Sequence, residues 1–72
     1  MALVWTDVTS SQLSKIGYDA ETLKARILFS NGSEYEYDDV PESVVNDIIN
    51  AESVGRQFNA TLKYGFNYRR LS

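Results

Sequence analysis

The basic residues in the last third of the chain are the side chains best suited to binding a ligand. The segment RQFNATLKYGFNYRR, residues 56–70, contains four cations and no acid, whereas residues 1–54 contain three cations and all ten acids. The formal charge is therefore 3 − 10 = −7 for residues 1–54 and +4 for residues 55–72, or −3 in total. Such a segment is typical either of an anion site or of a face that acids of the same molecule neutralise.

The spacing of the residues in this segment predicts a helix with two distinct stripes. Val54, Phe58 and Leu62 recur every four residues as a buried stripe. Arg56, Asn59 and Lys63, at intervals of three and four residues, form an exposed cationic stripe. A serine before this helix is suited to capping it, and free N–H groups beside a basic residue are suited to an anion. The candidate ligand-binding residues are Arg56, Asn59, Lys63, Arg69, Tyr37 and Ser53.

Catalytic chemistry is not expected from this sequence. The chain has no histidine and no cysteine, so the usual general base, thiolate nucleophile and soft metal ligands are missing. Ser10 and Ser11 lack a base that would activate their hydroxyl groups, which favours a turn. The adjacent acids Asp38 and Asp39 are interpreted as a helix entry rather than a cation site. We therefore expect a protein that is not an enzyme and needs neither metal nor cofactor.

Alternating residues predict the strands that position these side chains. Residues 23–29 and 33–38 alternate between apolar and polar positions, which indicates two half-buried strands. A two-residue Asn-Gly turn between them would place glutamates on the core face. A three-residue loop, 30–32, instead pairs Ile27 with Tyr35 and Ala25 with Tyr37, and it pairs Arg26 with a glutamate on the other face. Both tyrosines are therefore expected at the core or its rim.

Further elements complete an α+β domain. Residues 13–18 predict a preceding strand, giving a three-stranded meander, and residues 66–71 predict a fourth, C-terminal strand. Pro41 suits the first turn of a helix that runs to about residue 52, and the second helix runs from about residue 54 to residue 64. The expected fold is a small antiparallel sheet packed against two consecutive helices, as one domain over residues 1–72.

Length and composition favour a stable, packed domain in the cytoplasm. Apolar residues make up 43% of the chain and charged residues 24%, which is ordinary for folded domains. No window has the ~20 apolar residues of a membrane span, and the first residues do not form a basic leader. Because 72 residues without cysteine bury a limited core, we expect self-association to a homo-oligomer.

The order and spacing of several short motifs resemble one known family. The motifs are Val8 with Ser10-Ser11, Ile16-Gly17-Tyr18-Asp19, Phe29 with Gly32, Tyr35-x-Tyr37, Val40-Pro41, Ala51-x-Ser53-x-Gly55 and Phe58-Asn59. The chain resembles the KTSC family over nearly all of its length. This domain is named for its place at the C-terminus of some lysyl-tRNA synthetases and also occurs in stand-alone bacterial and phage proteins. The resemblance implies a small α+β unit, with RNA binding suggested by the synthetase context.

Three functions follow from these observations. The first is a non-catalytic module that binds RNA or a phosphate-bearing nucleotide through the cationic stripe. The second is a phage or bacterial oligomer that sequesters a small nucleotide signalling molecule between subunits. The third is a protein–protein interaction module that uses a sheet edge or the apolar segment around Leu3 and Trp5.

Overall fold

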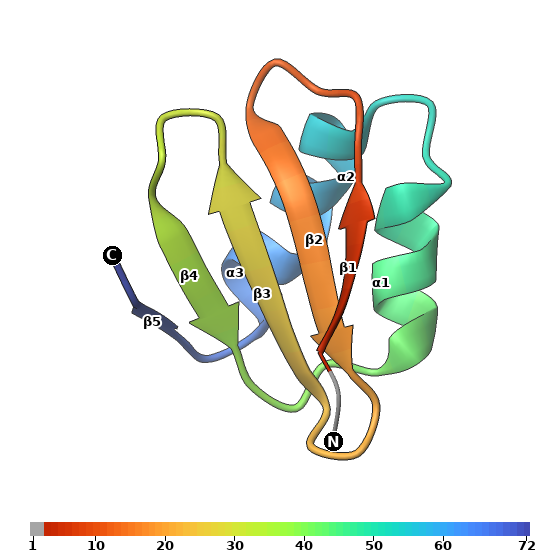
Figure 1. Ribbon diagram of the computed structural model, residues 1–72. Helices are drawn as coiled ribbons and strands as arrows, with labels where there is room; N and C mark the ends of the chain where they lie inside the picture. The colour runs from red at the N-terminus through yellow and green to blue at the C-terminus, as the bar shows by residue number, and fades with distance from the viewer. Residues whose placement is uncertain (1–2) are drawn as a thin grey trace.

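The computed structural model describes residues 3–72 and has two layers, an antiparallel sheet and a layer of helices on one of its faces (Figure 1). The α+β class is confirmed, but the sheet has five strands in the order β1-β2-β3-β4-β5 rather than three or four. The elements are β1 (Val4–Asp7), β2 (Leu13–Asp19), β3 (Lys24–Phe29), β4 (Glu34–Tyr37), α1 (Glu42–Ile49), α2 (Val54–Ala60), α3 (Leu62–Gly65) and β5 (Tyr68–Arg70).

The β3–β4 hairpin has the predicted register. Ile27 pairs with Tyr35 and Ala25 with Tyr37, while Arg26 lies opposite Glu36. The loop is the expected three-residue one, closed by a hydrogen bond of 2.8 Å from the Phe29 N–H to the Ser33 carbonyl. Gly32 occupies its left-handed position, with φ of 93°, a conformation that glycine adopts without steric cost. The core face of the hairpin is therefore aromatic and aliphatic, and its other face is charged.

Strand β3 begins one residue later than its alternating pattern suggested. Leu23, expected on the core face, is exposed and has a left-handed backbone with φ of 58°. It completes the turn after β2, in which the Asp19 carboxylate accepts hydrogen bonds from the backbone N–H groups of Glu21 and Thr22. The Leu23 carbonyl in turn accepts from the Val40 N–H at 2.8 Å. Turn geometry thus overrides the alternation at this position.

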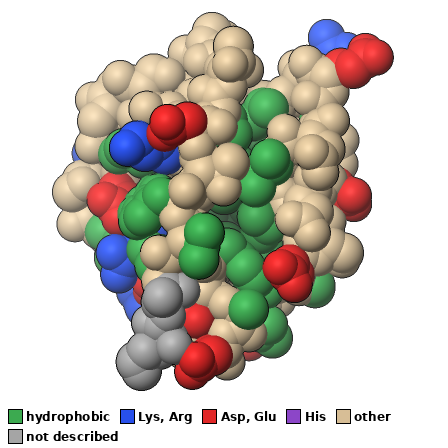
Figure 2. Space-filling view, turned by 45° about the vertical axis from the view of Figure 1, so that its right-hand side comes forward, with side chains coloured by type: hydrophobic (Ala, Val, Ile, Leu, Met, Phe, Trp, Pro, Cys, Tyr) green, Lys and Arg blue, Asp and Glu red, His purple; other side chains and the backbone are tan. Residues whose placement is uncertain are grey.

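Strand β1 lies at one edge of the sheet and was not predicted. It pairs with β2, with Trp5 directly opposite Gly17. A Cβ atom at Gly17 would lie 3.0 Å from the indole ring, so the ring packs flat against the backbone of β2. Figure 2 brings the β1 and α1 side of the domain forward and shows hydrophobic side chains gathered in the middle of this face. Val4, on β1, is 63% exposed.

The helices are shorter than predicted. The first ends at Ile49, and the expected continuous second helix is interrupted at Thr61, where φ is −120° and ψ is −73°. The Thr61 hydroxyl donates to the Gln57 carbonyl at 2.7 Å, and such back-bonding by a β-branched residue disturbs a helix. The apolar stripe nevertheless continues across the break, because Phe58 and Leu62 are both buried.

The hydrophobic core lies between the sheet and the helices. Its buried members are Leu13, Ile16, Tyr18, Ala25, Ile27, Tyr37, Val40, Val45, Ile48, Val54, Phe58 and Leu62. The Tyr18 hydroxyl donates to the Val40 carbonyl at 2.6 Å, which satisfies both polar groups inside the core. No helix within residues 3–72 is long and apolar enough to cross a lipid bilayer.

Candidate ligand-binding site

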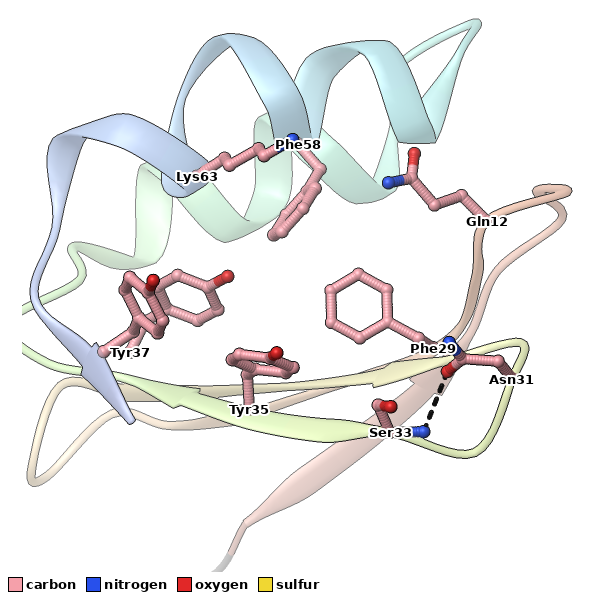
Figure 3. A pocket seen from close by; sticks show the side chains of 9 residues that line it. Gln12, Phe29, Asn31, Ser33, Tyr35, Tyr37, Phe58 and Lys63 are labelled. Atoms are coloured by element: carbon pink, nitrogen blue, oxygen red, sulfur yellow. Dashed lines mark hydrogen bonds between the residues drawn. The ribbon is translucent and has the colours of Figure 1, made fainter. Parts of the chain in front are cut away.

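An aromatic cleft opens between the sheet and the helices near β4 and β5. Its volume is about 350 Å³, which is within the range of small-molecule sites. In Figure 3, Phe58 points into it from the helix layer, while Phe29, Tyr35 and Tyr37 rise from the sheet. The residues that line the aromatic cleft are Gln12, Phe29, Asn31, Ser33, Tyr35, Tyr37, Phe58, Lys63 and Tyr68.

Ring-to-ring contacts hold the walls of the aromatic cleft in place. Phe29 packs edge-on against Tyr35 and Phe58, with centroid distances of 5.4 and 5.6 Å. On the other side, the Tyr68 ring lies 5.7 Å from Tyr35 and 5.5 Å from Tyr37. Aromatic pairs at these separations stabilise each other beyond their buried area. The cleft is therefore bounded by rings whose orientation the fold itself fixes.

The tyrosine hydroxyl groups of the aromatic cleft have no hydrogen-bond partner among residues 3–72. This applies to Tyr35, Tyr37 and Tyr68, in contrast to the paired hydroxyl of Tyr18. Burial, with smaller contributions from the other two tyrosines, raises the pKa of Tyr37 to about 12. Its phenol group is therefore neutral near pH 7, and it is able both to donate and to accept a hydrogen bond.

Polar residues surround the aromatic rings at the rim of the cleft. The Asn31 side-chain oxygen accepts a hydrogen bond from the Ser33 N–H at 3.0 Å, which ties it into the β3–β4 loop. Lys63 is the charged residue of this lining, and no acid is present in it. The Lys63 ammonium group also lies 5.5 Å from the ring centre of the adjacent Tyr64. The cleft therefore combines flat apolar walls with a positive charge.

A polar pocket of about 370 Å³ adjoins the aromatic cleft. It lies between the segment before β2 and the start of α2, and Gln12 lines both cavities. Gly55 allows the two segments to approach, since a Cβ atom there would lie 3.1 Å from the Gln12 side-chain oxygen. The residues that line the polar pocket are Thr9, Ser10, Ser11, Gln12, Glu52, Ser53, Val54, Gly55, Arg56 and Asn59.

Local hydrogen bonds explain the shape of the polar pocket. The Ser10 hydroxyl accepts from the backbone N–H groups of Gln12 and Leu13, at 3.1 and 3.3 Å, as expected of a turn residue. The Ser53 hydroxyl accepts from the Arg56 N–H at 3.4 Å, so Ser53 caps α2 as predicted. The side-chain oxygen of Asn59 is buried but has no hydrogen-bond partner within the described chain.

The predicted site residues do not line a single cavity, and the predicted stripe of Arg56, Asn59 and Lys63 is divided between two. Tyr37 and Lys63 line the aromatic cleft, whereas Ser53, Arg56 and Asn59 line the polar pocket. The fold brings these five residues into two adjoining cavities that share Gln12.

Arg69 does not extend this surface. Its guanidinium group pairs with the buried carboxylate of Glu36, to which Arg26 Nε also donates at 3.2 Å. Glu36 alternates along β4 with the core-facing Tyr35 and Tyr37. The ion pairs therefore lie on the open face of the sheet, away from the helices.

Sequence reasoning missed Tyr68 and Gln12 as site residues. The alternation in residues 66–71 placed Tyr68 on the opposite face from Arg69, but only the pairing of β5 with β4 brings it beside Tyr37. Gln12 had no distinguishing pattern at all. Its role depends on the packing of two segments that are distant in the sequence.

The acidic pair before α1 has a structural role. The Asp38 carboxylate accepts a hydrogen bond from the Lys24 ammonium group at 2.7 Å, and this bond lowers the pKa of Asp38. Asp39 adopts a left-handed backbone with φ of 56° in the turn before α1. Within residues 3–72, no group of three or more acidic, histidine or cysteine side chains is arranged to hold a metal ion.

These features define a small two-layer α+β domain with an aromatic cleft between its layers. Comparison with known families identifies it further, because the sequence model of the KTSC domain matches residues 9–66. The chain belongs to the KTSC domain family.

Individual relatives agree with this assignment. The crystal structure of a KTSC domain protein from Yersinia pestis superposes with a TM-score of 0.90 at 33% identity, covering 99% of this chain and 100% of that one. An uncharacterized protein of Stutzerimonas stutzeri is 43% identical over 54 residues, which is 75% of this chain and 76% of that protein. A lysine–tRNA ligase of Nostoc punctiforme is 40% identical over 62 residues, covering 86% of this chain but 11% of the ligase.

Proposed function

We propose that this domain is a non-catalytic module that binds RNA or a phosphate-bearing nucleotide. The observation that supports this most is the adjacency of the aromatic cleft and the polar pocket, which share Gln12 and contain Lys63 and Arg56 respectively. Aromatic walls beside a basic groove are the combination by which proteins bind single-stranded nucleic acid. Neither cation forms a salt bridge within residues 3–72, so both charges are available to a phosphate group.

The family relationship is consistent with this proposal. One similar protein is named a lysine–tRNA ligase, and a ligase of that name acts on a tRNA. This chain corresponds to only 11% of that protein, so the ligase activity itself is not transferred to the domain. A small added module that contacts RNA would fit both contexts. The modest number of free cations argues for a single strand or a nucleotide rather than duplex binding, which needs many phosphate contacts.

Fluorescence anisotropy with short labelled single-stranded RNAs tests the proposal. The parent protein should bind, and the double variant Arg56→Gln with Lys63→Gln should bind about a hundredfold more weakly, since a hydrogen bond to a charged group contributes at least about 1.5 kcal/mol. The matched control is Lys15→Gln with Lys24→Gln, which removes the same charge from the open face of the sheet. Equal weakening by both double variants would show a general charge effect and contradict the proposed site.

The dependence of binding on salt gives an independent count of phosphate contacts. For single strands, log K falls with log salt with a slope of about −0.7 per neutralised phosphate. Two contacts therefore predict a slope near −1.4, and the Arg56 and Lys63 double variant should show a slope near zero. A slope that is unchanged in this variant would mean that other residues contact the phosphates.

A further inference from the structure

We propose that the aromatic cleft is a binding site for one unstacked nucleobase, with the attached phosphate at Lys63. This inference rests on the proposed function and specifies how the ligand is held. Tyr35 and the exposed Tyr68 present rings on one side of the cleft, with centroids 5.7 Å apart, and both strands are backed there by the buried Tyr37. A planar base gains about 1–3 kcal/mol from stacking on such a ring.

Hydrogen-bonding groups favour a base over a purely apolar ring. The three tyrosine hydroxyl groups have no partner within residues 3–72, and the Gln12 side chain forms no hydrogen bond in this part of the chain either. A nucleobase edge carries donors and acceptors that match phenol and amide groups. An aliphatic ligand would leave these groups unpaired, which costs free energy once they are desolvated.

The size of the cleft suits a single nucleotide unit inside it. A volume of about 350 Å³ is near the lower limit for ligand sites, which suits one base with its ribose rather than a whole cyclic dinucleotide. Lys63 is at the rim, and the polar pocket with Arg56 continues from Gln12. A strand with its base in the cleft therefore has a path for the next phosphate toward Arg56.

The test uses a five-nucleotide RNA that contains one 2-aminopurine, a fluorescent base whose emission is quenched by stacking. Binding to the parent protein should change this emission, and Tyr68→Leu should weaken binding at least about fivefold, the loss that corresponds to one stacked base. Tyr68 is 57% exposed, so the fold should tolerate the change, which a thermal melt checks. The matched control is Trp5→Leu, because Trp5 is 40% exposed, lies on β1 and is outside the cleft.

A further measurement keeps the inference separate from the proposed function. An RNA in which an abasic site replaces the 2-aminopurine should bind the parent at least about fivefold more weakly, and this comparison needs no variant. If the abasic RNA binds equally well but the Arg56 and Lys63 double variant still loses binding, the base site is wrong and the phosphate site stands. If no RNA or nucleotide binds the parent at all, both proposals fail. Binding reduced equally by Trp5→Leu and Tyr68→Leu would also overturn the cleft assignment.

Discussion

Replacing Glu36 with glutamine tests whether Arg69, one cation of the basic tail, contributes to the stability of the fold. The Glu36 side chain is 7% exposed and lies between the Arg26 and Arg69 guanidinium groups. The substitution preserves the shape of the side chain but removes its charge, so Arg69 loses its carboxylate partner and Arg26 keeps only Glu34, at 3.5 Å. The two ion pairs of Glu36 also join three strands, because Arg26 lies on β3, Glu36 on β4 and Arg69 on β5. We therefore expect the substitution to loosen β5 first.

The size of the effect follows from the exposure of the three side chains. Removing one partner of a fully buried ion pair costs about 3–5 kcal/mol, while exposed pairs contribute about 0–1 kcal/mol. The Arg26 and Arg69 side chains are 38% and 57% exposed and are able to turn toward water. We expect Glu36→Gln to lower the free energy of unfolding by about 2 kcal/mol, a large share of the ~4–11 kcal/mol typical for this length.

Urea denaturation measures this change directly. With an m-value of about 1–2 kcal/mol/M, a loss of 2 kcal/mol lowers the midpoint by about 1–2 M. The matched control is Glu34→Gln, since Glu34 lies 3.5 Å from the same Arg26, has a side chain that is 24% exposed and does not contact Arg69. The control should cost no more than about 1 kcal/mol. Equal midpoints for the two variants would refute the argument that burial makes Glu36 special.

Three other predictions concern separate parts of the fold. Tyr37→Phe should reduce the loss of folding stability between about pH 10 and pH 12, because burial raises the pKa of Tyr37 to about 12 and an unfolded tyrosine titrates near 10. The folded parent therefore holds this proton and loses stability as the pH rises through that window. A parent and variant with the same alkaline urea midpoints would contradict this. Gly17→Val should shift the emission of the single tryptophan to longer wavelength, because a side chain at position 17 displaces the Trp5 indole ring toward water; an unchanged spectrum would count against the contact. Self-association should appear in sedimentation, since β1 is a free sheet edge and Val4 on it is 63% exposed; a monomer across a wide micromolar range would disprove it.

The parts of the fold that depend on local patterns could be predicted from the sequence. The β3–β4 register follows from the alternation of apolar and charged residues on two neighbouring strands, together with a glycine that suits a left-handed position. The Ser53 cap was predicted for the same reason, because its oxygen bonds a nearby backbone N–H. In both cases the residues that interact are close in the sequence.

The parts that depend on distant contacts could not be predicted. Strand β1 has four residues, and its most distinctive side chain is placed by a ring contact with Gly17. The partner of β5 was not specified, so neither the Arg69–Glu36 pair nor the position of Tyr68 in the aromatic cleft followed from the sequence. The helix break at Thr61 was missed because the apolar spacing continues through it.

The arrangement of the basic tail bears on two interpretations of its charge. If its cations only neutralised the acidic remainder of the chain, each would be expected near a carboxylate. Arg69 meets this expectation through Glu36, but Arg56, Lys63 and Arg70 form no salt bridge within residues 3–72. Arg70 instead donates to the Ser72 carbonyl at 2.9 Å. The alternation along β5 therefore places Arg69 on the open face of the sheet, where it pairs with Glu36. The helices place Arg56 and Lys63 at the two cavities. Arg69 thus has a structural partner on the open face, and Arg56 and Lys63 are the two cations of the tail on which the proposed ligand site depends.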